Sequence, residues 1–430
     1  MSKLQYLHNL AKLRSVELIL VIGLFSTLIV WGSYTFWPLF LSFIGLIEWC
    51  RQTPHSKKWF EDHLVNEARR LLWSSFAIFI SISLILEIYH TGTIQIPEHL
   101  ALFIIYPLIA TTIANHRLTP FWFWIGVSAG AVAGCLFAVF QVYTTGERAY
   151  GLLNPITFGD TAVVLCAASF IGLAFLDFKQ AENKNLRLLL LVGATCGMIT
   201  SLLSGSKGGW LSLSTIIIFA VIKIIQSVNF RQKIILLILI GSILSATVLL
   251  VPKSLVHNRI LSGWNGLVTW IETGKVTEGS VSMRLEFWAA GIEIFKENPL
   301  IGLGHTATNQ FRIDLAKTPR YSPELTILKT FDNEYINRLA NHGALGLLGT
   351  IVLFVLPFFA FYRFRKNENS SVKALGYLGM TLPVLYMEFG LSVSIFDTNI
   401  FRQVYVSWLI TLLALIAVQQ NSSMKSADLE

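Results

Sequence analysis

Charged residues are scarce in this sequence. Asp, Glu, Lys and Arg make up 13% of its 430 residues, whereas soluble globular proteins carry about 25%. Hydrophobic residues make up 54%, and the mean hydropathy is +0.61. This composition excludes an ordinary soluble domain and favours a chain that crosses a membrane many times.

Cysteine is also rare, and the short motifs of common cofactor and metal sites are missing. No CxxC, HExxH, Walker or dinucleotide-binding motif occurs, so the sequence gives no reason to expect a cofactor or a metal. The basic N-terminal segment is followed by a span-length apolar run without a small-residue cleavage site, so we do not expect a cleaved signal peptide. The cysteines lie in or beside apolar runs and are expected to serve packing rather than a disulfide framework; they are Cys50, Cys135, Cys166 and Cys196.

About twelve apolar runs dominate the chain. A spanning helix needs ~20 mostly apolar residues, and backbone polar groups in lipid must be paired within the protein. The runs lack the alternation that is typical of barrel strands. We therefore predict an all-α polytopic membrane protein, with spans centred near Leu24, Phe40, Ile80, Ile105, Ala131, Ala168, Val192, Ile217, Ile240, Leu353, Leu385 and Leu412.

Lysine and arginine are concentrated in every second connection, which predicts how the chain lies in the membrane. With the N-terminus in the cytoplasm, the cytoplasmic connections hold most of the basic residues, as the positive-inside rule requires. Both termini then lie in the cytoplasm. The formal net charge of +8 is mainly a topology signal and does not call for nucleic acid as a partner. The short outer loops contain only Arg148, Lys207 and Arg402.

One outer connection is too long to be a simple turn. Residues 252–341 carry aromatic side chains at helical spacing and no low-complexity run, so we expect an ordered, partly helical loop with a function. The predicted organisation is therefore residues 1–251 with nine spans, residues 252–341 as a loop that carries the active site, and residues 342–430 with three spans and a cytoplasmic tail.

Arg284 and Trp288 lie on one stripe of a predicted helix within this loop. The stripe continues through Gly291 and Phe295 at helical spacing. The arginine could stack on Trp288 in a structural role, or its planar guanidinium could bind a phosphate group. We favour the phosphate.

A second helix begins near Asp332 and continues into the tenth span. Asp332 lies where a helix N-cap is expected; alternatively, Asp332 or Asn333 could bind a sugar hydroxyl, or Asp332 could act as a general base. His342 follows ten residues later. At 1.5 Å per residue this is about 15 Å along a continuous helix, so Asp332 and His342 could not serve the same atom. His342 could also pack at the membrane boundary.

Two short outer loops carry single cations. The segment TTGERAYGLLNPITFGD contains Arg148, which could pair with Glu147 at the interface or bind an anion. The segment SLLSGSKGGWLSL contains Lys207 among glycines, whose amides can approach an anion; a solvated lysine in a glycine-rich turn is the alternative. Glu388, inside the eleventh span, is a further candidate because intramembrane acids are usually functional.

These segments together resemble the O-antigen ligase and O-antigen polymerase superfamily. The similarity is carried by the pattern R-x-x-x-W-x(10)-P-x-x-G-x-G at 284–304, by NEYINRLANHGALG, and by the two short outer loops. It extends over about residues 147–349. The order of these motifs and the predicted topology agree with the family.

The resemblance implies a GT-C-like, metal-independent glycosyltransferase of the bacterial inner membrane, with a periplasmic active site and a role in lipopolysaccharide biosynthesis. The donor would be a glycan on undecaprenyl diphosphate. The acceptor would be lipid A–core for a ligase, which we favour, or another lipid-linked glycan for a polymerase. In this family arginines engage the diphosphate, a role that would fall here to Arg284, Lys207 and Arg148, with Trp288 and Asn333 also contacting substrate. Membrane lipids are the remaining expected partners.

The chain departs from the family pattern at two positions. Lys207 stands where the family usually has an arginine, which keeps the charge but loses the bidentate fork. Asp332 stands where a histidine commonly precedes the Asn-Glu pair, so the general base could be Asp332, His305 or His342. A transporter of lipid-linked oligosaccharides is an alternative class, but it would show internal repeats and a polar central cavity. A non-catalytic envelope assembly protein is the other.

Overall fold

A computed structural model describes residues 15–51, 62–93, 98–152, 154–177, 183–227, 253–274, 276, 280–327 and 329–427. Within these ranges the regular structure is helical and contains no strand, which confirms the all-α class for the described residues. The helices are α2 (Ser15–Ser26), α3 (Ser33–Cys50), α5 (His63–Thr91), α6 (Glu98–Ile105), α7 (Leu108–His116), α8 (Pro120–Thr145), α9 (Pro155–Phe175), α10 (Asn183–Ser204), α11 (Lys207–Ser227), α13 (Lys253–Thr273), α14 (Ser280–Glu297), α15 (Gly304–Leu315), α16 (Glu334–Tyr362), α17 (Ser370–Phe389) and α18 (Asn399–Ala427), with short 3-10 turns at Pro323–Thr326 and Arg363–Lys366.

Six helices in the described part of the chain are long and apolar enough to cross a membrane: α5, α8, α9, α10, α16 and α18. Helices also cover the predicted centres in α2, α3, α6, α11 and α17. However, α2 is short, and the run of α6 and α7 is interrupted beside Pro107. The centre near Ile240 lies outside the described residues. The number of twelve spans therefore stays a prediction.

The outer faces of the bundle expose large apolar side chains, as a lipid-facing surface would. Examples are Phe36 and Phe43 on α3, Leu136 and Phe140 on α8, and Ile85 on α5, each more than half exposed. Many exposed large apolar side chains on several helices are expected where a protein faces lipid or a partner. Together with the long apolar helices, it supports a membrane protein.

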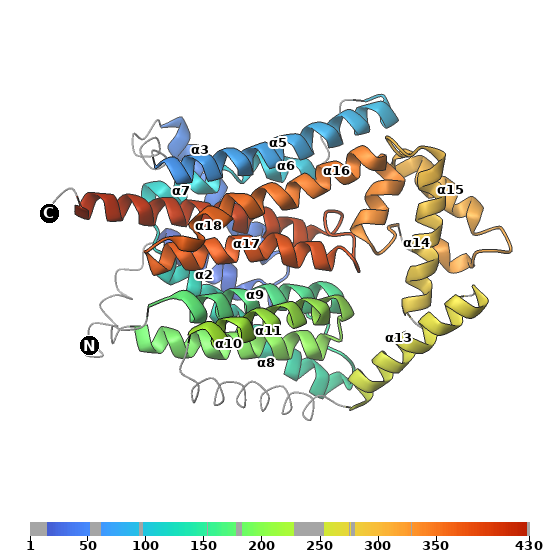
Figure 1. Cartoon of the computed structure of the whole chain (residues 1–430), viewed down its shortest axis with the longest axis horizontal. Helices are drawn as coiled ribbons and strands as arrows, with labels where there is room; N and C mark the ends of the chain where they lie inside the picture. The colour runs from blue at the N-terminus through green and yellow to red at the C-terminus, as the bar shows by residue number, and fades with distance from the viewer. Residues whose placement is uncertain are drawn as a thin grey trace.

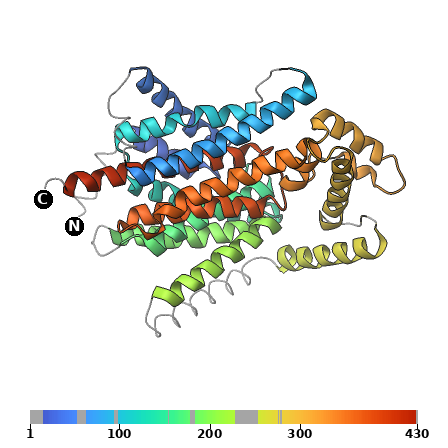
Figure 2. The ribbon, with the colours of Figure 1, turned by 45° about the horizontal axis from the view of Figure 1, so that its top comes forward.

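Helices α13, α14 and α15 lie together at one end of the bundle, and the C-terminal end of α18 lies at the opposite end (Figure 1). The view turned by 45° shows the same arrangement (Figure 2). Most of the predicted loop 252–341 is therefore helical rather than irregular. Helix α14 packs on α16 around a small core of its own, formed by Phe287, Ala290, Ile294, Leu315, Tyr321, Leu325, Phe331 and Ala340.

Helix α16 is kinked at Gly343, where the segment after α14 docks against it. Gly343 has φ 64° and non-helical geometry. The amides of Ala344 and Leu345 donate to the carbonyls of Pro299 and Leu300 at 2.8 and 3.1 Å. A Cβ on Gly343 would lie 2.4 Å from the Leu300 carbonyl carbon, and one on Gly302 equally close to Asn341. Glycine is thus required at both positions, and the expected continuous helix from Asp332 through the tenth span is wrong.

Candidate active site

Arg284 and Asp332, predicted from separate motifs, meet at the junction of α14 and α16. The Arg284 Nε donates to Asp332 Oδ2 at 3.4 Å, with side chains 15% and 24% exposed. Asp332 has φ 49°, a left-handed conformation that aspartate tolerates better than most residues. Burial raises the pKa of the Asp332 carboxyl, and the neighbouring Arg284 charge opposes this rise.

Asn333, not Asp332, caps helix α16, so the N-cap expectation for Asp332 is wrong by one residue. The Asn333 Oδ1 accepts from the amides of Tyr335 and Ile336 at 2.9 and 3.1 Å. Its Nδ2 donates to the Leu391 carbonyl at 3.3 Å, and the Glu334 amide donates to the Gly390 carbonyl at 2.8 Å. Because the cap is supplied by Asn333, the Asp332 carboxylate is left to face Arg284.

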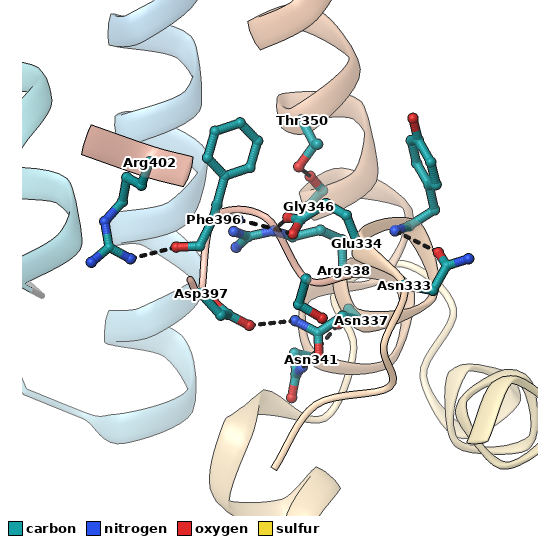
Figure 3. A network of polar contacts seen from close by, with 12 residues as sticks. Asn333, Glu334, Asn337, Arg338, Asn341, Gly346, Thr350, Phe396, Asp397 and Arg402 are labelled. Carbon is teal, nitrogen blue, oxygen red and sulfur yellow. Dashed lines mark hydrogen bonds and ion pairs between the residues drawn. The ribbon is translucent and has the colours of Figure 1, made fainter. Parts of the chain in front are cut away.

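A buried ionic network holds the first turns of α16 against the loop between α17 and α18 (Figure 3). The Arg338 Nε donates to Glu334 Oε1 at 2.6 Å, and Glu334 Oε2 accepts from the Phe396 amide at 3.1 Å. The Asn337 Nδ2 donates to Asp397 Oδ2 at 2.6 Å. The Arg338 guanidinium also lies over the ring of Phe396 at 5.9 Å. Removing one member would leave a buried charge poorly compensated, which is strongly destabilising, so the network fixes the backbone that presents Asp332.

Lys207 is the first residue of α11, and its side chain reaches toward the outer helices. A Cβ on Gly263 of α13 would lie 2.9 Å from Lys207 Nζ and 3.5 Å from Val281 of α14. A Cβ on Gly208 would lie 2.2 Å from the Ser392 hydroxyl. The loop that supports Asn333 through Leu391 therefore also contacts the start of α11, which brings the Lys207 turn beside the Asp332 end of α16.

The Arg148 segment packs beside the same turn. The amide of Ala149 donates to the Leu203 carbonyl at the end of α10 at 3.0 Å. The segment is held by buried Gln141 of α8, whose Oε1 accepts from the amides of Tyr150 and Gly151 and whose Nε2 donates to the Gly151 carbonyl. Arg148 thus sits, half-buried, next to the α10–α11 connection that carries Lys207.

The two predicted histidines form a separate pair. The rings of His305 and His342 meet edge to face with centroids 5.1 Å apart. His305 is the second residue of α15 and is exposed, whereas His342 is buried at the kink of α16. This pair lies nearly three helical turns from Asp332 along α16, so the structure joins His305 to His342 but not to the Arg284–Asp332 pair.

Trp288 packs against the small core of α14 and is half-buried. Among the described residues, the cation–π contacts do not include Arg284 over Trp288, and the Trp288 Nε1 has no hydrogen-bond partner there. The predicted stripe nevertheless faces α16: a Cβ on Gly291 would lie 2.3 Å from Ile336 and 3.2 Å from Phe331. The stripe orients α14 so that Arg284 reaches Asp332.

Sequence reasoning did not single out several residues that support this site. Asp160, Gln141, Glu334 and Arg338 are all buried polar groups. Glu334 and Arg338 stand at i, i+4 spacing at the start of an apolar helix, which was an available signal for an intramembrane ion pair. Asp160 likewise stands alone inside an apolar run. Only the contacts of the fold show what these groups touch.

Comparison with known proteins identifies the central part of the chain. Residues 188–351 match the family model described as O-antigen ligase. A Haemophilus influenzae protein described only as uncharacterized is 25% identical over 370 residues, which cover 85% of this chain and 89% of that protein. The family match includes Lys207, Arg284 and Asp332, whereas Arg148 and Asp160 precede it. Residues 188–351 are therefore an O-antigen ligase family domain, which confirms the resemblance carried by the sequence motifs and is consistent with the O-antigen ligase superfamily.

Proposed function

We propose that this protein is an O-antigen ligase-like glycosyltransferase that transfers a glycan from undecaprenyl diphosphate to lipid A–core at the periplasmic face of the inner membrane. Members of the matched family are glycosyltransferase-like enzymes. The observation that carries the proposal is the Arg284–Asp332 pair, which places a cation and a candidate base side by side within the family domain. The turns with Lys207 and Arg148 lie at the same end of the bundle.

The proposed reaction is a substitution at the anomeric carbon of the donor glycan. The acceptor hydroxyl oxygen forms a bond to this carbon while the bond to the diphosphate oxygen breaks, and the bonding electrons leave with the diphosphate. Arg284 and Lys207, with Arg148 nearby, stabilise the growing negative charge of the leaving group. Fixed cations in a partly dehydrated site do this more effectively than water.

Asp332 is the proposed base that accepts the proton of the acceptor hydroxyl. An exposed aspartate has a pKa near 3.9 and is a weak base at neutral pH. Burial raises the pKa of Asp332, while Arg284 pulls it down. When the donor diphosphate engages Arg284, that opposing charge is partly neutralised, so the carboxylate becomes more basic as the donor binds. His305 and His342 lie apart from this pair, and Asn333 supports the backbone beside it.

An apolar cavity between the helices offers a place for part of the lipid tail. It has a volume of about 190 Å³ and lies among α9, α11, α16 and α17. Its lining includes Phe170, Thr215, Phe358, Tyr377 and Met380. A tail held between the helices would keep the donor in register with the cations and so supply the proximity part of catalysis.

The direct test is glycan transfer by the purified protein in detergent or proteoliposomes. The donor is an oligosaccharide on undecaprenyl diphosphate, and two acceptors are offered in parallel, lipid A–core and a second lipid-linked oligosaccharide. We expect lipid A–core to gain the glycan. Growth of only the second acceptor would make the protein a polymerase, and transfer to neither would reject the glycosyltransferase proposal.

A further inference from the structure

The side chain of Asp160, a residue of α9, is fully buried. It lies beside the start of the neighbouring helix α11. Its Oδ1 accepts from the Ser206 hydroxyl at 2.6 Å, and the Ser206 Oγ in turn accepts from the Gly209 amide at 3.4 Å. Its Oδ2 has no hydrogen-bond partner among the described residues. A carboxylate at a helix N-terminus is favoured by the helix dipole, and here it accepts from Ser206, the residue just before Lys207.

The turn around Asp160 is closely packed. A Cβ on Gly209 would lie 2.8 Å from both Asp160 Oδ1 and the Ser201 hydroxyl. A Cβ on Gly159 would lie 2.0 Å from the Ser204 hydroxyl. The glycines therefore let α9 approach the α10–α11 connection closely. The position of Lys207 follows from where Asp160 holds Ser206 and, through the Ser206 hydroxyl, Gly209.

Asp160 is also linked electrostatically to the other side of the site. Its charge interacts with that of Arg284, which contacts Asp332 on its other side. Burying a carboxylate without a direct ion pair is costly, and the hydrogen bond from Ser206 offsets part of that cost. Asp160 therefore lies between the element that carries Lys207 and the one that carries Arg284.

We propose that Asp160 is a positioning residue that fixes Lys207, through Ser206 and Gly209, in the geometry that binds the donor diphosphate. This inference rests on the proposed function. Asp160 does not touch the substrate; its negative charge near the site would by itself weaken anion binding. Its contribution is therefore the hydrogen-bonded placement of the α11 start, and it acts through Lys207.

The test is a double-mutant cycle on the full-length protein, measured as KM for the lipid-linked donor and as kcat. Asp160→Ala should raise the donor KM about tenfold and change kcat less. Asp160→Asn should recover most of this loss, because its amide oxygen can still accept from the Ser206 hydroxyl. Ser206→Ala should give an intermediate loss. In a Lys207→Ala background, Asp160→Ala should change the donor KM by less than about twofold, because coupled residues are not additive.

If the donor KM of the double variant rises by the product of the two single-variant increases, the proposal is overturned. An unchanged donor KM in Asp160→Ala would overturn it as well. If Asp160→Ala does not fold, the same cycle is run with Ser206→Ala. Its increase in donor KM must also disappear in the Lys207→Ala background. Binding of farnesyl diphosphate, measured as Kd, separates the two proposals. A wild-type protein that binds this probe but transfers no glycan rejects the proposed function, and the cycle is then judged on Kd. A wild-type protein that does not bind it rejects the positioning role.

Discussion

At the scale of single residues, the central feature is an arginine shared between a carboxylate and a candidate phosphate site. Arg284 contacts Asp332 with one nitrogen, Nε, at 3.4 Å, which is long for a charge-assisted hydrogen bond. A diphosphate, which carries more charge and more acceptor oxygens, can compete for the same guanidinium. The resting pair therefore keeps both groups oriented in the half-buried site until the donor arrives.

Charge reversal at Arg284 should abolish glycan transfer while leaving membrane insertion intact. In Arg284→Glu a carboxylate would face both Asp332 and the leaving diphosphate, so we expect at least a ~10²-fold loss of kcat/KM, the scale seen when one electrostatic donor is removed. Arg284→Lys should be intermediate because the fork is lost. Arg320→Glu is the matched control, since this exposed arginine pairs with Glu293 in the same outer segment. Normal transfer by Arg284→Glu would remove Arg284 from the mechanism.

The pH dependence of kcat should report the base. Asp332 must be ionised to accept a proton, so kcat should fall as the pH drops through its pKa, which lies above the ordinary 3.8. Asp332→Asn should lower kcat by about 10²–10⁴-fold, the usual worth of a general base. Asp332→His should restore transfer and move the acidic limb upward, toward the imidazole pKa near 6.5. An unchanged acidic limb in Asp332→His would assign the base to another residue.

At the scale of elements, the site depends on how short segments are held at one end of the bundle. Residues 298–304 dock backbone to backbone into the kink at Gly343. The loop 390–398 joins the start of α16 to the start of α11 through Leu391 and Ser392. The motif P-x-x-G-x-G and the glycine of NHG are therefore two halves of one contact, which spacing along the chain does not reveal.

Replacing Gly343 by alanine should loosen this docking. Gly343 has φ 64° and ψ −161°, a combination that is essentially restricted to glycine and costs other residues about 1–3 kcal/mol. Overpacking adds typically 1–3 kcal/mol, so we expect a destabilisation of about 3 kcal/mol. Gly146→Ala is the control, because Gly146 has φ 70° with nothing within 4 Å of a new Cβ. Thermal unfolding in detergent should show a clearly larger loss for Gly343→Ala. Equal losses would mean that backbone strain alone, without docking, accounts for the need for glycine at position 343.

At the scale of the whole molecule, the candidate active site lies where many helix ends meet. The ends of α10 and α17 and the starts of α9, α11, α16 and α18 lie toward the end of the bundle that carries α13–α15 (Figure 1). Helices that begin and end at one end of a bundle reach the same membrane face if they span it. One labelling experiment can therefore check whether residues 252–341 lie on the predicted outer side of the membrane.

Single cysteines introduced into a cysteine-free background should be labelled from opposite sides of the inner membrane. Lys317→Cys lies near the end of α15, where the native side chain is 68% exposed, and Glu368→Cys lies exposed between α16 and α17. In spheroplasts, a membrane-impermeant maleimide should react with position 317 but with position 368 only after permeabilisation. The reverse pattern would place the candidate active site in the cytoplasm and exclude a periplasmic transfer reaction.

The sequence by itself determined the all-helical class, the apolar runs, and the identity of Arg284, Lys207 and Asp332 as candidates. These follow from local physics, because a run of apolar residues must pair its backbone internally in lipid whatever lies beside it. Only the tertiary structure decided that Arg284 contacts Asp332 and that Asn333 caps α16. It also decided that His305 and His342 pair with each other, and that Asp160 accepts a hydrogen bond from Ser206 beside Lys207. These contacts join residues far apart in the chain, and their geometry depends on helix packing and on close approach at glycines, which no local pattern encodes.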